Sequence, residues 1–149
     1  MGAERDACLL LALGDELFGL ELSSVAAVVP WSATSPVPFQ QPDKFGSILY
    51  RGRFVGVVDL ASMLGLEPFS PGEKSVIAIC ERDGALMGLA APATRGIVRN
   101  LDTLAEVAVL GRHMGALVGR ALKFEGETIN LIDAEKFAAA VMERLEKSR

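Results

Sequence analysis

Apolar and polar positions alternate in short runs along this chain, with turn-forming residues between the runs. Residues 7–13 (ACLLLAL) and 17–22 (LFGLEL) flank the polar turn GDE and predict a β-hairpin. Residues 75–81 (SVIAICE) and 85–91 (ALMGLAA) flank a second polar turn, RDG, and predict another hairpin. Each run is far shorter than the roughly 18 apolar residues of a membrane-spanning helix. The pattern is typical of an all-β protein with short strands.

The predicted strands belong to an internal repeat. Two alignments of the chain with itself place glycine on glycine, aspartate on aspartate and apolar residues on apolar residues. The matched residues are Gly19 with Gly88 at an offset of 69 residues, and Gly52 with Gly126 and Asp59 with Asp133 at an offset of 74. The change of offset requires one longer loop in the second half. We therefore interpret the chain as two copies of one β unit.

This repeat predicts a single domain over residues 1–149 with two small β-barrel subdomains, approximately the halves 1–72 and 73–133. Barrels suit short strands because a sheet that curls closed hides its edges. The alternative is one lipocalin-like barrel that encloses a small ligand. The segment ASMLGLEP at residues 61–68 argues against it, because it interrupts the strand series where an up-and-down barrel would continue.

Asp59 and Asp133 each end an apolar strand and precede a helical pattern. A side-chain oxygen at such a position accepts hydrogen bonds from the free N–H groups of a first helical turn, so we expect both aspartates to cap helices. After Asp133, residues four apart form one apolar stripe and predict a C-terminal helix over 133–147. The competing hypothesis is an enzyme that uses these two carboxylates together. The repeat argues against it, since it assigns them to separate barrels.

Composition adds few constraints. Half of the residues are hydrophobic and the net charge is −4, which argues against non-specific binding of nucleic acid. The start of the chain has neither the net positive charge nor the cleavage site of a secretory signal, so we expect a cytoplasmic protein without membrane insertion. The second half is slightly basic, which predicts either a solvated face or a patch for an acidic protein partner. Its charged side chains include Arg95, Arg99, Arg112, Arg120 and Lys123.

Motifs for catalysis are absent from the sequence. There is no phosphate-binding glycine loop, no nucleophile elbow and no G-x-G-x-x-G dinucleotide fingerprint. His113 is the single histidine, and we expect it in a solvated loop. Cys8 and Cys80 lie apart within apolar runs, which predicts two buried thiols and no disulfide framework. We expect no enzyme activity, no cofactor and no metal site.

Several segments, in order, resemble the CheW family of bacterial chemotaxis coupling proteins over essentially the whole chain. They are LLALGDELFGLEL, SVAAVVP, VPFQQPDKFGSILYRGRFVGVVDLASMLGL, LMGLAAPATRGIV and INLIDAEKF. The resemblance implies two five-stranded β-barrels around a shared apolar region. It also implies a non-catalytic adaptor between the regulatory domain of a CheA-type histidine kinase and the cytoplasmic tip of a methyl-accepting chemotaxis receptor.

The resemblance also implies partner-binding residues. Val25 corresponds to the kinase-contacting edge, Arg51 to the arginine before the glycine, and Phe54 to an apolar contact beyond it. Gly46 lies in the part associated with receptor coupling. Ala27 stands where the family usually has a glutamate that pairs with the arginine. We therefore expect Arg51 to seek an acid elsewhere, as on a partner.

Other positions also depart from the family's pattern. Gly56 replaces a proline, Ala61 an arginine, and Ala91-Pro92 a Val-Asp pair. These departures leave the expected fold unchanged and open the alternative of a divergent scaffold in a non-motility pathway.

Overall fold

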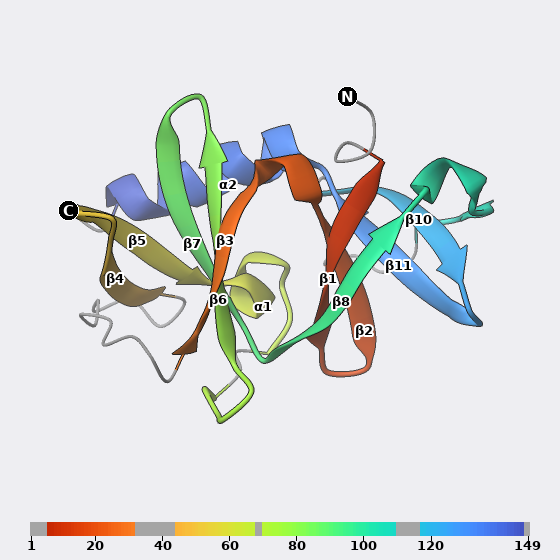
Figure 1. Ribbon diagram of the computed structural model, residues 1–149, viewed down its shortest axis with the longest axis horizontal. Helices are drawn as coiled ribbons and strands as arrows, with labels where there is room; N and C mark the ends of the chain where they lie inside the picture. The colour runs from red at the N-terminus through yellow and green to blue at the C-terminus, as the bar shows by residue number, and fades with distance from the viewer. Residues whose placement is uncertain (1–5, 32–43, 68–69, 110–116, 148–149) are drawn as a thin grey trace.

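The computed structural model describes residues 6–31, 44–67, 70–109 and 117–147, which form two curled β-sheets and a C-terminal helix (Figure 1). The strands are β1 (Ala7–Leu13), β2 (Glu16–Glu21), β3 (Val25–Pro30), β4 (Lys44–Tyr50), β5 (Arg53–Asp59), β6 (Val76–Arg82), β7 (Ala85–Ala91), β8 (Ala93–Arg99), β9 (Glu106–Val107), β10 (Val118–Phe124) and β11 (Glu127–Ile132). The helices are α1 (Leu60–Met63) and α2 (Ala134–Lys147), with short 3-10 turns η1 (Leu22–Ser24) and η3 (Leu101–Thr103). The all-β prediction is confirmed, as are both hairpins.

The order of strands confirms the repeat. Sheet A has the order β8-β1-β2-β11-β10-β9, and sheet B has the order β3-β6-β7-β5-β4. The two orders coincide when β1, β2, β8, β10 and β11 are matched with β6, β7, β3, β4 and β5, leaving β9 as an addition to sheet A. The registers match too. Gly88 pairs with Val57 in the parallel pair of sheet B, and Gly19 pairs with Leu131 in the parallel pair of sheet A.

Each sheet combines strands from both halves of the chain. The β1–β2 hairpin of the first half joins β8–β11 in sheet A, and the β6–β7 hairpin of the second half joins β3–β5 in sheet B. β3, from the first half of the chain, pairs with β6, and β8, from the second half, pairs with β1. Sheet B is therefore the continuous segment 25–91, and sheet A combines 7–21 with 93–132. The expected division into one barrel per half does not coincide with these sheets. The repeat identifies equivalent strands, but it does not determine which copy each strand pairs with.

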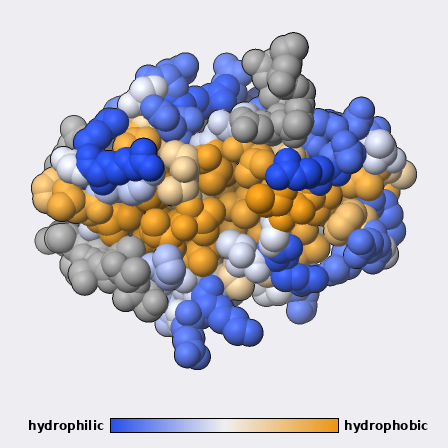
Figure 2. All heavy atoms as spheres, in the orientation of Figure 1, coloured by the Kyte–Doolittle hydropathy of each residue, from blue (hydrophilic) through white to orange (hydrophobic). Residues whose placement is uncertain are grey.

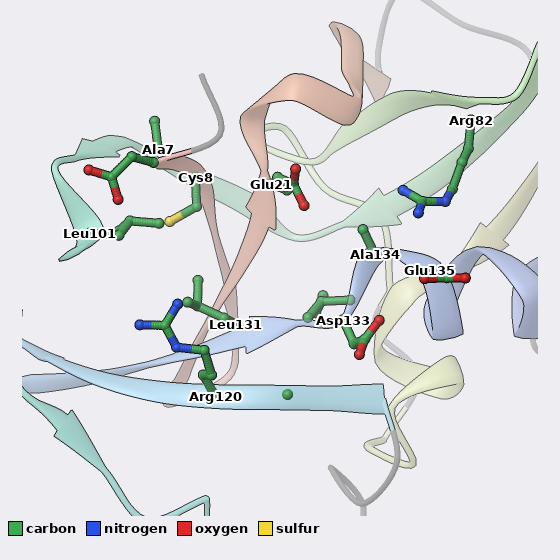
Figure 3. Close-up of a pocket in the computed structure, with 13 residues that line it drawn as sticks. Ala7, Cys8, Glu21, Arg82, Leu101, Arg120, Leu131, Asp133, Ala134 and Glu135 are labelled. Carbon is green, nitrogen blue, oxygen red and sulfur yellow. The ribbon is translucent and has the colours of Figure 1, made fainter. Parts of the chain in front are cut away.

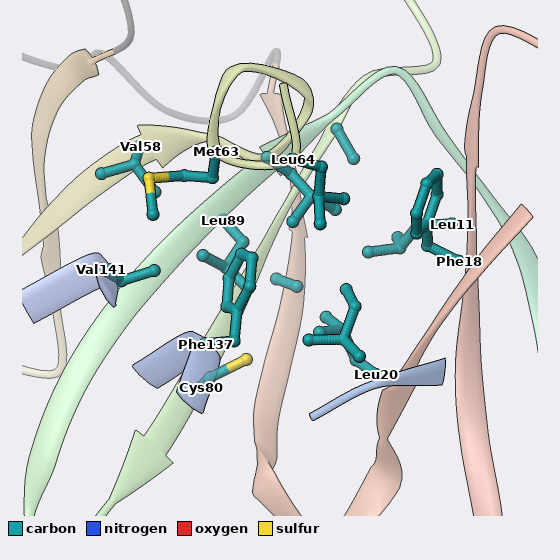
Figure 4. Packing of buried hydrophobic residues seen from close by; sticks show 14 of the residues in the cluster. Leu11, Phe18, Leu20, Val58, Met63, Leu64, Cys80, Leu89, Phe137 and Val141 are labelled. Carbon is teal, nitrogen blue, oxygen red and sulfur yellow. The ribbon is translucent and has the colours of Figure 1, made fainter. Parts of the chain in front are cut away.

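Buried side chains fill three places. The largest cluster lies between the sheets, where Phe18 of sheet A, Leu89 of sheet B, Leu64 after α1 and Phe137 of α2 pack together (Figure 4). A second cluster around Leu122 fills sheet A. A third fills sheet B and contains Ile48, Val55, Val57, Ile77, Ile79 and Ala90. Because side chains occupy both sheet interiors, the single ligand-enclosing barrel is wrong.

Both predicted helix caps are present. The Asp59 side chain accepts hydrogen bonds from the Ala61 and Ser62 backbone N–H groups, and Asp133 Oδ1 accepts one from the Lys136 N–H at 3.1 Å. The helix after Asp133 is confirmed as α2, which crosses from the end of β11 to sheet B. In the described parts of the chain, no helix has the length and apolar character needed to cross a membrane.

Candidate functional site

The hairpin between β4 and β5 carries the most exposed large apolar side chains of the described residues. We call residues 49–54, LYRGRF, the β4–β5 tip. Leu49 is 65% exposed and Phe54 is 77% exposed, and the two residues pair directly across the strands. Exposed apolar groups of this size mark surfaces that bind partners when they lie together. The tip is therefore the leading candidate for an interaction surface.

The turn at this tip fixes the direction of its arginine. Arg51 and Gly52 both have positive φ, at 49° and 79°, as a two-residue hairpin turn with φ above zero at both positions requires. The Arg51 guanidinium carbon lies 5.4 Å from the centre of the Tyr50 ring, an arrangement that holds the cation over an aromatic face. Arg53 Nη2 donates to the Gly84 carbonyl at 3.4 Å. The tip thus places two cations beside two apolar side chains.

The family resemblance singled out Arg51 and Phe54 of this tip and did not single out Leu49 or Arg53. The hairpin register could have revealed Leu49 from the sequence. A two-residue turn at 51–52 pairs Leu49 with Phe54, and strand alternation then puts both on the face opposite Ile48. Strands usually alternate between buried apolar and exposed polar residues. In this hairpin the exposed face also carries apolar residues, Leu49 and Phe54.

The other three candidate residues lie elsewhere in sheet B. Gly46 is buried on β4, with φ of 115° beside an irregularity in the β4–β5 pairing, so its backbone conformation explains the glycine. Val25 and Ala27 lie on β3, at the opposite end of the sheet's strand order, and both are half-buried. Val25 packs on the cluster between the sheets. Ala27 packs on the interior cluster of sheet B, so a glutamate there would enter apolar surroundings.

Apolar surface also extends beyond the tip. Figure 2 shows an apolar belt along the long axis of the molecule, with hydrophilic residues on both sides of it. Val28 on β3 and Ile97 on β8 are 39% and 48% exposed, and they are equivalent positions of the repeat. A surface with these features suits protein contacts better than small-molecule chemistry.

A polar pocket of about 340 Å³ lies where sheet A meets the start of α2 (Figure 3). Arg82 and Arg120 lie on opposite sides of it, with Glu21 and Asp133 between them. Arg120 forms an ion pair with Glu106 at 3.4 Å. Both basic and acidic side chains line the pocket, so it has no net electrostatic preference for an anionic or a cationic ligand. Across the described residues, no group of three or more histidine, cysteine or acidic side chains is placed to hold a metal.

The remaining candidates for chemistry have structural surroundings. Both cysteines are buried free thiols, and burial raises the pKa of Cys8 to about 11 and that of Cys80 to about 12, which removes nucleophilic thiolate at neutral pH. Asp59 and Asp133 cap different helices, which disfavours the paired-carboxylate enzyme. His113 lies outside the described residues.

The basic side chains of the second half form a weaker patch than their number suggests. Arg95 pairs with Glu127 at 3.4 Å, and Arg120 pairs with Glu106 at the same distance. All four side chains are about half exposed or more, so these pairs reduce the local positive charge and add little stability. Arg112, a further member of the expected patch, lies outside the described residues.

Comparisons with known proteins agree with the fold. The family model described as CheW-like domain matches residues 7–142. A probable chemotaxis protein CheW of Rhizobium etli is 27% identical over 92 residues, which cover 62% of this chain and 59% of that protein. A chemotaxis protein CheW of Rhizobium meliloti is 26% identical over 90 residues, which cover 60% of this chain and 58% of that protein. The matched region therefore spans about three fifths of the length of these curated relatives.

Among solved structures, the scaffolding protein TtCheW from Thermoanaerobacter tengcongensis has a TM-score of 0.73 with this chain at 23% sequence identity. The match covers 87% of this chain and 89% of that protein. At this level of identity, the likeness shows that the two proteins share a fold.

Proposed function

Because this chain belongs to the CheW-like domain family, we propose that it is a non-catalytic cytoplasmic adaptor of chemosensory signalling. In this proposal it binds the regulatory domain of a CheA-type histidine kinase and the cytoplasmic tip of a methyl-accepting chemotaxis receptor. The similar proteins named CheW and the scaffolding protein of the same fold support an adaptor role. Association with receptor arrays follows from the same family.

The β4–β5 tip is the observation that carries the proposal. Phe54 and Leu49 provide exposed apolar area, while Arg51 provides a planar guanidinium that can bind a carboxylate through two hydrogen bonds. We assign the kinase-facing surface to Arg51 and Phe54, with Val25 as a further contact, and receptor coupling to the region of Gly46. Ala27 carries no carboxylate, so it offers Arg51 no partner within the chain.

Isothermal titration of the purified chain with a kinase regulatory domain tests this assignment. Arg51→Ala should weaken binding at least about tenfold, because loss of a buried interfacial charge pair costs on the order of 2–5 kcal/mol. The melting temperature should stay nearly unchanged, since Arg51 is exposed and its stacking on Tyr50 contributes about 0.5–1 kcal/mol at such a site. Equal affinities for both proteins would remove Arg51 from the kinase surface.

A divergent scaffold in a non-motility pathway is the second candidate. The observation that favours it is the interior position of Ala27, where the family's usual glutamate is absent. The kinase and receptor that co-purify with the tagged chain from its native host, identified by mass spectrometry, distinguish the two. A flagellar-motility receptor and kinase would support the standard pathway, and a different pair would support the divergent one.

A further inference from the structure

Tyr50 is the residue of the β4–β5 tip that has no role in the proposed function. Its side chain is half-buried and packs against the interior cluster of sheet B. The Arg51 guanidinium carbon lies 5.4 Å from the centre of the Tyr50 ring. The same ring therefore contacts the core of sheet B and an exposed cation.

The contact with this ring is what restricts the Arg51 side chain. Within the parts of the chain that the structure describes, no carboxylate forms an ion pair with Arg51. Arg53 differs, because its Nη2 donates to the carbonyl of Gly84 in the turn between β6 and β7. A guanidinium over an aromatic face interacts through its charge, so its N–H donors stay available to a carboxylate.

The turn itself does not require an arginine. Its first position has positive φ, which glycine, asparagine and aspartate adopt at the lowest cost. The β6–β7 hairpin of the same sheet has Asp83 at the equivalent turn position, with φ of 52°. Arg51 has almost the same φ, 49°. A long side chain in a conformation that costs stability points to a role outside the turn.

The repeat provides a comparison within the chain. Tyr50 and Arg51 correspond to Phe124 and Glu125 at the offset of 74 residues, and Glu125 has φ of 48°. Phe124 packs against the interior cluster of sheet A, so a ring at this position supports the sheet in both copies. A cation follows the ring only in the β4–β5 tip, and the negative face of an aromatic ring attracts a cation and repels a carboxylate.

We propose that Tyr50 is a positioning residue, which holds the Arg51 guanidinium in place for a carboxylate of the partner that binds the β4–β5 tip. The identity of this partner rests on the proposed function, whereas the arrangement of Tyr50 and Arg51 does not. An arginine side chain loses conformational freedom on binding, and this loss lowers affinity. A guanidinium restrained on a ring has lost part of that freedom already. When a partner covers the tip, the ring and the cation also leave water, which strengthens their attraction.

Proton NMR of the free chain tests the position of Arg51 without a partner. Protons above an aromatic ring resonate upfield of their usual positions. The Arg51 side-chain protons should be shifted upfield in the wild type and in Tyr50→Phe, which keeps the ring. They should return to their usual positions in Tyr50→Leu, which keeps apolar bulk without a ring. Phe124→Leu is the matched control, because it removes the equivalent ring and should leave the Arg51 protons unchanged.

Calorimetric titration with the kinase regulatory domain tests the effect on binding. Tyr50→Leu should weaken binding at least about threefold, and Tyr50→Phe should bind like the wild type. In an Arg51→Ala background, Tyr50→Leu should have no further effect, because a positioning residue acts only through Arg51. A ring that merely supports the hairpin would instead weaken binding equally in both backgrounds.

Equal weakening in both backgrounds, or wild-type affinity of Tyr50→Leu, would overturn the proposal. Usual proton positions for Arg51 in the wild type would do so as well. A wild type that does not bind the kinase domain would overturn the proposed function instead. The proton shifts of the free chain would then still decide whether Tyr50 holds Arg51.

Discussion

Substitution of Gly88 by alanine tests how the repeat packs its sheets. Gly88 lies in β7, where it pairs with Val57 of β5 and Ile79 of β6. An alanine Cβ there would lie 3.0 Å from Val57 Cγ2, 3.1 Å from Ile77 Cγ2 and 3.3 Å from the Gly56 carbonyl oxygen. The equivalent Gly19 has the equivalent neighbours, since its Cβ would meet Leu131 and Cys8 below 3.0 Å. The absence of a side chain is therefore a shared requirement of both sheets.

The size of the effect follows from how little these neighbours can move. Val57 and Ile77 are β-branched, and each is stiff about χ1, so neither methyl can swing away without leaving its rotamer. Overpacking of a buried site costs about 1–3 kcal/mol. Alanine recovers about 0.5–1 kcal/mol, because glycine in a strand loses more backbone entropy on folding. Gly88→Ala should therefore lower the free energy of unfolding by about 1–2 kcal/mol, or the melting temperature by about 2–8 °C.

Urea unfolding followed by circular dichroism measures this difference. Gly72→Ala is the matched control, because no atom lies within 4 Å of its added Cβ, and its stability should change by less than about 0.5 kcal/mol. In a Val57→Ala background, which removes the nearest methyl, Gly88→Ala should cost less than in the wild type. Unchanged or increased stability of Gly88→Ala, or an equal cost in both backgrounds, would refute the packing argument.

Three further predictions concern stability. Asp59→Ala should cost about 1–3 kcal/mol in urea unfolding because buried N–H groups lose their acceptor, whereas Asp59→Asn should cost less than about 1 kcal/mol. Phe137→Ala should cost about 3–5 kcal/mol in the same assay, since this side chain is buried between the sheets. Burial raises the pKa of Cys8 and Cys80 from 9.0 to about 11 and 12, so unfolding titrations should show full stability below pH 9 and decreasing stability as pH rises toward 12.

The exposure of the β4–β5 tip was accessible from the sequence because its geometry is local. The turn at Arg51-Gly52 and the strand alternation around it place Phe54 outside, and both features span only a few residues. Ala27 was different. Its half-buried position depends on how β3 packs across sheet B, and no pattern within β3 itself reveals that packing. Leu49 was missed because the usual expectation of polar residues on an outward strand face does not hold at this hairpin.

The sequence by itself determined the hairpins, the two helix caps, α2 and the equivalence of the two copies. These features arise from periodicity, turn chemistry and spacing, which act between residues near one another in the chain. The tertiary structure decided that the β1–β2 and β6–β7 hairpins each join strands of the other half, and it decided the parallel pairs at Gly19 and Gly88 and the division of the chain into its two sheets. It also placed the β4–β5 and β10–β11 hairpins at opposite ends of the molecule (Figure 1). These outcomes depend on pairing between strands that are distant in the sequence. Because equivalent strands of the two copies have similar local sequence patterns, those patterns do not determine which copy a strand pairs with.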